Sequence, residues 1–230
     1  GYSNIPAFSL DVYTPAQTAS AGGAGTNDVL VFHGSTDAPT VDVDELVQVG
    51  AEVVPDLGYG DFAGYLPLPL ANYTLQIQAD ATGDAVAAFY APLADLSIDG
   101  AALTVIASGF LDPSANSNGP AFGLFVSTGA AGPLLALPSP TARVEVIHNA
   151  ADTLLDVVDV FINGAEAIPD FAFRTSTGFI TLDAGMPLDI NAAPDGAGLA
   201  GSVDLLDVDF LYPDSTYILI ANGTASPGYA

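Results

Sequence analysis

Hydrophobic and polar residues alternate over short stretches along the whole chain. Leu30 and Phe32 stand two positions apart, as do Val144 and Val146. Clusters of aspartate, glycine and proline, such as residues 80–84, separate these stretches. A period of two over about four to eight residues, bounded by turn residues, is typical of half-buried antiparallel strands. The pattern therefore predicts an all-β protein.

The chain also contains two copies of one repeat, displaced by about 114 residues. Pro55-Asp56-Leu57 corresponds to Pro169-Asp170-Phe171, and Leu103 to Gly109 corresponds to Tyr217 to Gly223. Internal repeats are read before individual elements because they decide the architecture. Each repeat is long enough to bury a core of its own, so the sequence predicts two β-sandwiches in tandem.

A segment similar to the closing strand of the first repeat stands near the N-terminus. The first repeat continues to residues 120–128, P-A-F-G-L-F-V-S-T, and we find no counterpart after the second repeat. Residues 6–14, P-A-F-S-L-D-V-Y-T, match residues 120–128 at the same displacement of 114. Alternation puts Phe8, Leu10 and Val12 on one face of this segment. We therefore expect the N-terminal segment to act as the closing strand of a second repeat.

These observations predict a complete domain organisation. We expect an N-terminal donor-like strand over residues 1–16, a linker over 17–27, a first β-sandwich over 28–128, a second linker over 129–141, and a second β-sandwich over 142–230 that lacks its final strand. The two linkers are rich in Gly, Ala, Pro, Ser and Thr, a composition typical of flexible connections.

A sandwich without its last strand exposes an edge that must be filled. Three fillers are open: the chain's own N-terminal strand, the strand of a second copy, or the next unit of a longer tandem chain. The last two give a linear head-to-tail assembly, because a heterologous contact that does not close makes a fibre. The expected donor residues are Pro6, Phe8, Leu10, Val12 and Tyr13, and the expected acceptor residues are Val144, Val146, Tyr217 and Leu219.

Charge and composition exclude several kinds of partner. The chain has 27 acidic residues against two arginines and no lysine, for a formal net charge of −25. Nucleic acids and anionic membranes would repel such a chain, so we expect neither nucleic acid binding nor direct membrane insertion. Cysteine is absent, which excludes disulfides and thiolate metal sites. Copies of the same chain are the expected partners, in an exported protein.

The opening of each repeat resembles a known family. The first repeat has His33, then Asp37-Ala38-Pro39 and Val41-Asp42-Val43, and the second has a degenerate copy with His148, Asp152 and residues 159–164. This opening resembles a family of uncharacterised secreted domains of bacteria and archaea, often found in tandem on surface proteins. The resemblance implies immunoglobulin-like sandwiches at the cell surface, and it implies no known chemistry.

Two histidine and aspartate pairs are the main candidates for chemistry. A histidine beside a carboxylate, as in His33 with Asp37 or His148 with Asp152, is a general-base or metal-ligand arrangement. Because no further ligand or nucleophile motif accompanies either pair, we interpret both as structural. We therefore expect no enzymatic activity and no catalytic residues.

Other polar residues suggest weaker sites. No cofactor is expected, although calcium is possible because it binds oxygen ligands; we favour a solvated acidic surface over a calcium site. The weak calcium candidates are Asp42, Asp44, Asp80, Asp84, Asp207 and Asp209. Asn72 and Asn222 begin sequons for N-glycosylation.

The sequence thus predicts a structural subunit of an extracellular filament, pilus-like fibre or surface stalk, joined by donor-strand complementation. The alternative is a monomeric secreted module that binds carbohydrate or another surface ligand through loop aromatics. Tyr59, Tyr65 and Tyr90 are the candidates for that binding.

Overall fold

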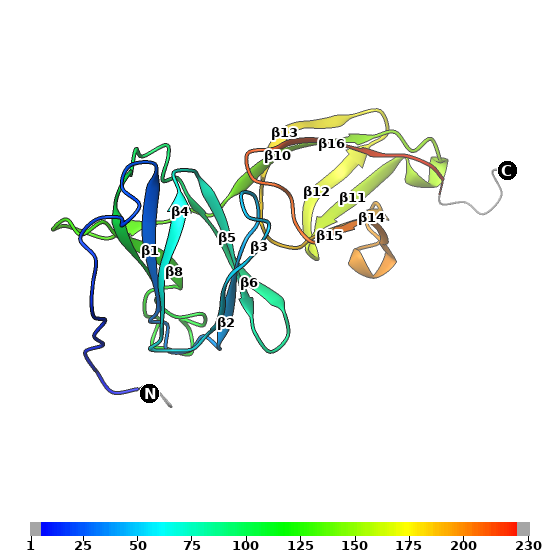
Figure 1. Ribbon diagram of the computed structural model, residues 1–230. Coiled ribbons are helices and arrows are strands. Elements are labelled where there is room, and N and C mark those ends of the chain that lie inside the picture. The colour runs from blue at the N-terminus through cyan, green and yellow to red at the C-terminus, as the bar shows by residue number, and fades with distance from the viewer. Residues whose placement is uncertain (1–5, 225–230) are drawn as a thin grey trace. The chain divides into compact units, whose positions relative to one another are not determined.

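The computed structural model describes residues 6–224, which form strands joined by turns and loops (Figure 1). Residues 1–5 and 225–230, the outer ends of the predicted donor-like strand and second sandwich, lie outside the described residues. The chain divides into two compact units, Gly1–Ser139 and Pro140–Ala230. The predicted all-β sandwich fold is confirmed. No helix in the described part of the chain is long and apolar enough to cross a membrane.

From residue 6 onward, the first unit contains nine strands in two sheets. One sheet has the order β4-β1-β7-β8-β9 and the other has the order β3-β2-β5-β6. The strands are β1 (Thr26–His33), β2 (Val41–Glu45), β3 (Ala51–Leu57), β4 (Phe62–Pro69), β5 (Tyr73–Ala79), β6 (Asp84–Ala91), β7 (Ala102–Ser108), β8 (Gly123–Ser127) and β9 (Leu135–Ala136).

The core of the first unit lies between these two sheets. On β7, Leu103, Val105 and Ala107 are buried, while the residues between them are half-buried. Leu124 and Val126 of β8 are buried in the same way. Successive side chains of a strand point to opposite faces, so the alternation in the sequence directly fills this core.

The second unit contains seven strands and two short 3₁₀ helices among its described residues. Its sheets have the orders β13-β10-β16 and β12-β11-β14-β15. The elements are β10 (Thr141–His148), η1 (Thr153–Leu155), β11 (Val157–Ile162), β12 (Ala165–Ala172), β13 (Ser176–Asp183), β14 (Leu188–Pro194), η2 (Leu199–Gly201), β15 (Val203–Val208) and β16 (Thr216–Ala221).

The two units repeat the same topology. In the first unit β1 pairs with β4 antiparallel and with β7 parallel, and in the second unit β10 pairs with β13 antiparallel and with β16 parallel. Strands β10 to β16 therefore correspond to β1 to β7 in order and in pairing. Within residues 6–224, the second unit has no strand that corresponds to β8 or β9.

The segments expected to be linkers pack against the first unit instead. Within residues 129–141, β9 pairs with β8 and Leu137 is buried in the core. Within residues 17–27, Ser20 is buried, and the Asn27 side chain donates to the Ile98 carbonyl and accepts from the Ala101 N–H. Glycine and proline interrupt regular strands but do not prevent an irregular segment from packing. Composition alone therefore did not separate a flexible linker from a fixed one.

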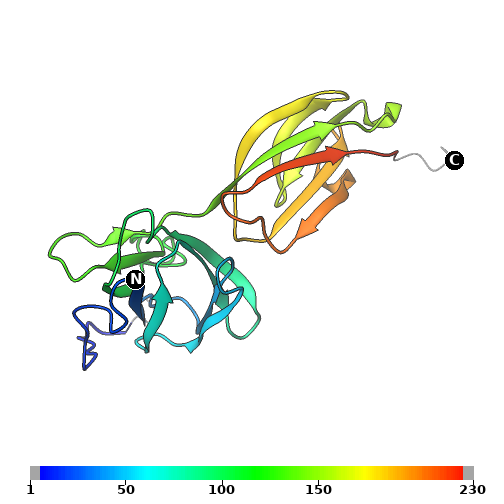
Figure 2. The same cartoon turned by 45° about the horizontal axis from the view of Figure 1, so that its top comes forward.

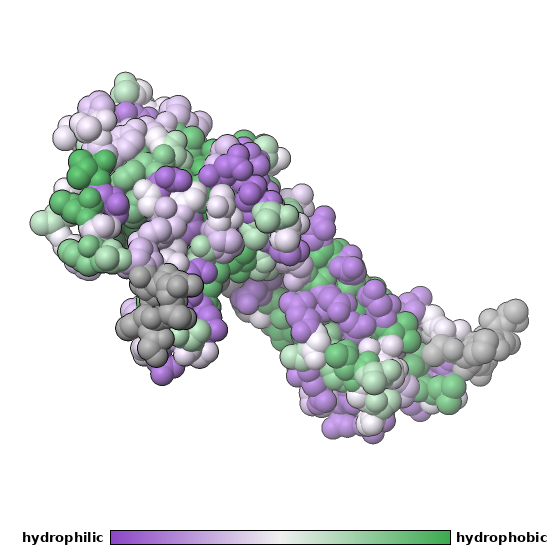
Figure 3. Space-filling model, turned by 90° about the horizontal axis from the view of Figure 1, so that it is seen from below, coloured by the Kyte–Doolittle hydropathy of each residue, from purple (hydrophilic) through white to green (hydrophobic). Residues whose placement is uncertain are grey.

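Hydrophobic side chains also reach the surface of the molecule. Hydrophilic residues cover much of the face seen in Figure 3, and hydrophobic residues lie between them. The exposed hydrophobic residues include three in the N-terminal segment, Phe8, Leu10 and Val12, and four on the edge strands of the second unit, Val203, Leu205, Ile218 and Ile220.

Candidate functional site

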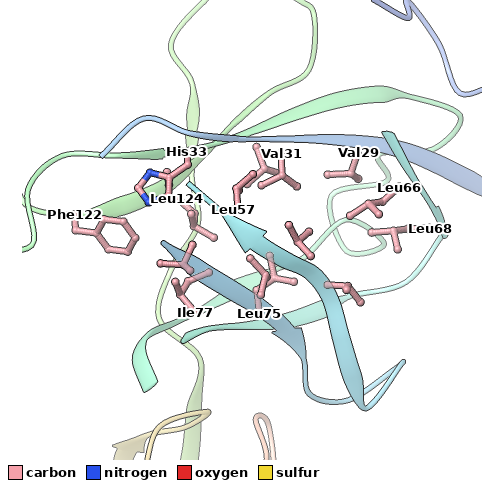
Figure 4. A pocket seen from close by; sticks show the side chains of 16 residues that line it. Val29, Val31, His33, Leu57, Leu66, Leu68, Leu75, Ile77, Phe122 and Leu124 are labelled. Atoms are coloured by element: carbon pink, nitrogen blue, oxygen red, sulfur yellow. The ribbon is translucent and has the colours of Figure 1, made fainter. Parts of the chain in front are cut away.

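Strand β8 completes the core of the first unit. It pairs antiparallel with β7, with Val126 opposite Val105 and Leu124 opposite Ala107. Phe122, just before β8, packs its ring against Phe89 at a centroid distance of 5.9 Å. Figure 4 shows Phe122 and Leu124 inside this core together with His33. The space left between the lining residues is only about 50 Å³, so this core is closed.

Strand β16 of the second unit occupies the position of β7 but has an open edge. It pairs with β10 on one side (Figure 2), and among the described residues no strand pairs with its other side. Tyr217, Leu219 and Ala221 are only half-buried, although the corresponding residues of β7 are buried. Ile218 and Ile220, on the opposite face, are each 58% exposed. Within residues 6–224, no strand closes the second unit as β8 closes the first.

A groove extends along this open edge. Two adjoining cavities of about 370 and 340 Å³ share Leu205 of β15 and Ala221 of β16 in their lining. We call them together the β16 groove; its lining includes Val146, His148, Leu205, Leu206, Leu219 and Ala221. The lining is mainly apolar, which suits an apolar occupant.

Equivalent glycines, Gly109 and Gly223, follow β7 and β16. Gly109 follows β7 with φ +88°, and a Cβ placed on it would lie 2.2 Å from the carbonyl oxygen of Ala121. The N–H of Phe110 donates to the Pro120 carbonyl, which ties the approach to β8 at this point. Gly223 corresponds to Gly109 and has φ +111°, yet no described atom lies within 4 Å of a Cβ placed there. The backbone after β16 thus keeps a positive φ at this position, and no described atom occupies the space beside it.

The predicted donor residues are exposed in the isolated chain. Residues 6–13 form no strand, and the exposed fractions of Phe8, Leu10 and Val12 are 104%, 87% and 73%. Pro6 is exposed too, whereas Tyr13 is half-buried against the first unit. Three large apolar side chains at alternate positions in water are unusual for a segment without a partner.

The predicted acceptor residues lie at different depths. Val144 and Val146 of β10 are buried, with Val146 lining the β16 groove, and Leu219 lines it from β16. Tyr217 is half-buried and packs on the core, and its hydroxyl accepts from the Tyr212 N–H at 2.9 Å. Sequence reasoning missed Leu205 and Leu206, which line the groove from the other sheet. The adjacent leucines in β15 were the available sequence signal for this side of the groove.

Both histidines hold loops together. His33 and His148 are each 1% exposed. The Nε2 of His33 lies 3.0 Å from the Pro39 carbonyl oxygen, and that of His148 lies 2.7 Å from the Leu155 carbonyl oxygen. In each case a ring N–H on Nε2 donates to the carbonyl oxygen. His148 also lines the β16 groove.

The aspartates that follow the histidines both accept hydrogen bonds from backbone N–H groups. Asp37 accepts from the backbone N–H groups of Leu111 and Asp112, at 2.9 and 3.0 Å. Asp152 caps η1 by accepting from the Leu154 N–H at 3.0 Å. The Asp37 contacts hold its loop to the segment that follows β7, and the Asp152 contact caps η1.

Two groups of three carboxylates occupy equivalent places in the two units. Asp42, Asp56 and Asp80 bring their oxygens within 4.8 Å of one another in the first unit, and Asp159, Asp170 and Asp195 do so in the second. Asp56 and Asp170 both have positive φ, 48° and 54°. Each donates its backbone N–H across the strand pair, to Asp42 at 2.8 Å and to Asp159 at 3.1 Å.

Each carboxylate group could offer one oxygen per residue to a cation. Three oxygens are fewer than the six to eight, roughly, that calcium takes. Of the sequence candidates, Asp42 and Asp80 are brought together, whereas Asp44, Asp84, Asp207 and Asp209 belong to neither group. Asp56 and Asp170 were missed as partners, although the repeated Pro-Asp pair was visible in the sequence.

Crowding of these charges affects their protonation. Partial desolvation, followed by the charges of Asp42 and Asp56, raises the pKa of Asp80 above its usual value. Desolvation and the charges of Asp42, Asp44, Asp56 and Asp80 raise the pKa of Glu52. The pKa of Asp44 is raised by desolvation and by Asp42. The first unit therefore carries unfavourable repulsion when this surface is fully ionised.

The sequon asparagines and the candidate binding tyrosines have local partners. Asn72 accepts from the backbone N–H groups of Ala94 and Asp95, and Asn222 accepts from the Asn149 side chain at the end of the β16 groove. The hydroxyl of Tyr65 accepts from the Gln17 N–H, and that of Tyr90 donates to Asp95. Tyr59, which is 42% exposed, lies 6.3 Å from His33 between ring centroids.

Comparison with known proteins finds a family match within the first unit. No curated protein matches the chain. One solved structure, a leucine-rich repeat protein from Bacteroides thetaiotaomicron, aligns with 87% of this chain at 11% identity and a TM-score of 0.23, and the chain spans 27% of its length. A likeness this weak carries no argument about fold or function. Residues 27–121, which lie in the first unit, match a family of domains of unknown function, DUF4397.

Proposed function

We propose that the chain is a structural subunit of an extracellular filament, pilus-like fibre or surface stalk, in which copies join head to tail. Residues 6–14 of one copy would enter the β16 groove of the next and take the position that β8 holds in the first unit. The observation that carries the proposal is the open edge of β16, which corresponds to the edge of β7 that β8 covers.

The match between the two segments supports this occupant. Phe122, Leu124 and Val126 fill the core of the first unit, and Phe8, Leu10 and Val12 stand at the same three positions of the N-terminal segment. Burial of each such side chain stabilises by about 1.5–3 kcal/mol. Backbone hydrogen bonds along β16 would add to this, as they do where a peptide extends an existing sheet.

The register of the first unit predicts the pairing in the assembly. Val126 lies opposite Val105 and Leu124 lies opposite Ala107. The displacement of 114 residues converts these pairs to Val12 opposite Leu219 and Leu10 opposite Ala221. Phe8 would then lie near His148, as Phe122 lies near His33 (Figure 4).

The assembly has a direction because the corresponding strand edge is covered in one unit and open in the other. The edge of β7 is covered by β8 of the same chain, so the first unit offers no equivalent groove. Each copy therefore presents one donor segment and one acceptor groove, on different units. Such a heterologous contact generates an open linear assembly. A longer chain in which the next unit follows through the peptide bond would have the same geometry.

The test compares the full chain with a variant that lacks residues 1–14. We expect the full chain to form assemblies under native conditions that return to 23.2 kDa on denaturation, measured by light scattering and intact mass. The shortened variant should remain monomeric because it has no donor. Assembly of the shortened variant at the same rate would contradict the proposal, and a denatured mass of many multiples would assign the linkage to one long chain.

A peptide of residues 6–14 provides the complementary test. Added to the shortened variant, it should bind the β16 groove and raise the melting temperature of the second unit. The control peptide carries Leu10→Asp, which puts a charge into the apolar groove. Equal effects of the two peptides would show that the groove does not recognise the alternating apolar residues.

A further inference from the structure

The base of the donor segment is fixed to the first unit at Tyr13. The Tyr13 ring lies 5.2 Å from that of Phe62 and 5.7 Å from that of Tyr65, between centroids, and both partners are on β4. The Tyr65 hydroxyl in turn accepts from the Gln17 N–H at 3.0 Å. Phe32 stacks on the other side of this cluster, 4.6 Å from Phe62. Tyr13 is thus the first residue of the chain's described part that packs on the sandwich.

The residues that follow Tyr13 are fixed as well. Ser20 donates its backbone N–H to the Gly100 carbonyl at 2.9 Å, and Ala21 donates to the Asp28 carboxylate at 2.7 Å. Val12, the last residue assigned to the groove, is therefore directly bonded to the first anchored residue. No flexible spacer separates the donor strand from the unit that carries it.

The register assigns Tyr13 a second set of contacts on the neighbouring copy. Ser127 lies opposite Thr104 in the first unit, and the same displacement puts Tyr13 opposite Ile218 of the acceptor. Both positions face away from the core, because the alternate positions of β7 and β8 are the buried ones. Ile218 and Ile220 are 58% exposed and offer an apolar surface to the ring. Aromatic and β-branched side chains opposite each other are a favourable pair across strands.

We infer that Tyr13 is an aromatic joint between successive copies, packed on Phe62 and Tyr65 of its own chain and on Ile218 of the neighbour. The inference rests on the proposed function and adds a contact of Tyr13 with the outward-facing side chains of β16. A joint of this kind fixes the direction of one subunit relative to the next, whereas a flexible linker would leave it free. The filament is therefore stiff across the contact between copies.

The test measures the persistence length of filaments by electron microscopy for the wild type, Tyr13→Ala and Tyr13→Phe. Tyr13→Ala keeps Phe8, Leu10 and Val12, so it should still assemble, but its persistence length should fall several-fold. Tyr13→Phe keeps the ring and should remain as stiff as the wild type. Leu96→Ala, which removes an exposed apolar side chain from another part of the first unit, is the control and should leave the persistence length unchanged.

The outcomes separate this inference from the proposed function. Tyr13→Ala filaments as stiff as the wild type would overturn the joint and leave donor-strand assembly intact. Folded Tyr13→Ala subunits that no longer assemble would also overturn it, because Tyr13 would then act in insertion itself. A wild-type chain that never assembles would overturn the proposed function and the joint together.

Discussion

Val126 of β8 lies directly opposite Val105 of β7, and the two side chains are 2% and 7% exposed. Their counterparts at the displacement of 114 residues are Val12 of the N-terminal segment, which is 73% exposed, and Leu219 of the second unit, which lines an open groove. Val126 covers Val105 within the first unit, whereas among the described residues no strand pairs with β16 at Leu219. The core of the first unit is therefore closed, whereas the second unit has the open β16 groove at the equivalent place.

Leucine truncations at two equivalent positions should affect different properties. One should lower the stability of the first unit, and the other should weaken assembly. Leu124→Ala removes a side chain that is 3% exposed and should lower the free energy of unfolding of the first unit by about 2–5 kcal/mol. Leu10→Ala removes one that is 87% exposed in the isolated chain and should leave the stability of the monomer unchanged. It should instead raise the concentration at which the chain assembles. Denaturant unfolding of dilute monomer and a sedimentation assay would measure the two effects.

This matched pair also has a clear contradicting result. If Leu10→Ala destabilised the dilute monomer as much as Leu124→Ala does, Leu10 would already be buried within its own chain. The closed-monomer alternative would then replace the assembly.

Ala221 offers a way to block the β16 groove. It corresponds to Ala107, which is buried opposite Leu124, and it lines the groove at the position predicted for Leu10. Ala221→Phe should fill open space, leave the second unit folded and prevent assembly. Ala107→Phe should overpack a closed core and cost about 1–3 kcal/mol of stability in the first unit. Thermal unfolding and light scattering of both variants would check these expectations.

A different result at Ala221 would be informative. Unimpaired assembly of Ala221→Phe would mean that no side chain of a neighbour occupies that position. The register of insertion proposed above would then be incorrect.

The acidic surface of the first unit should make its stability depend on pH in a defined direction. Asp80 and Glu52 have a pKa in the folded state above the usual values of 3.8 and 4.5. An acid whose pKa is raised by folding contributes stability below the unfolded pKa, and that contribution is lost as pH rises through the folded pKa. These groups should therefore make the first unit less stable at neutral pH than at mildly acidic pH.

Asp80→Asn should remove part of this dependence. In the presence of EDTA, the variant should raise the melting temperature of the first unit at neutral pH and have less effect near pH 4, about the usual pKa of aspartate. Asp84→Asn, at the start of β6 and outside the carboxylate group, removes one negative charge as well and is the control. An increase in melting temperature no larger than that of Asp84→Asn would refute the role of repulsion within the carboxylate group.

The sequence predicted the architecture well because the repeat and the alternation are local signals. The strand 120–128 was expected from the alternation of Phe122, Leu124 and Val126, and the structure has β8 at Gly123–Ser127. The expected acceptor residues lie on β10 and β16, and these two strands pair with each other. Matching the two repeats also predicted the correspondence of β10–β16 with β1–β7.

Contacts between segments far apart in the sequence were harder to predict. Asp56 approaches Asp42 and Asp80 only because a bulge with positive φ turns it across the strand pair. Tyr13 packs on Phe62 and Tyr65, and nothing in the spacing of these residues indicates that contact. The second wall of the β16 groove depends on how two sheets face each other, which periodicity along one strand does not encode.

Site-specific cross-linking between two chains is the most direct test of donor-strand assembly. The chain has no cysteine, so single cysteines report unambiguously. Phe125 lies opposite Ile106 in the first unit, which predicts that Asp11 of one copy lies opposite Ile220 of the next. A chain with Asp11→Cys should therefore join a chain with Ile220→Cys through a short thiol-specific cross-linker, and should join one with Thr216→Cys far less. Equal yields at the two positions, or no cross-linked pair at either, would contradict the account.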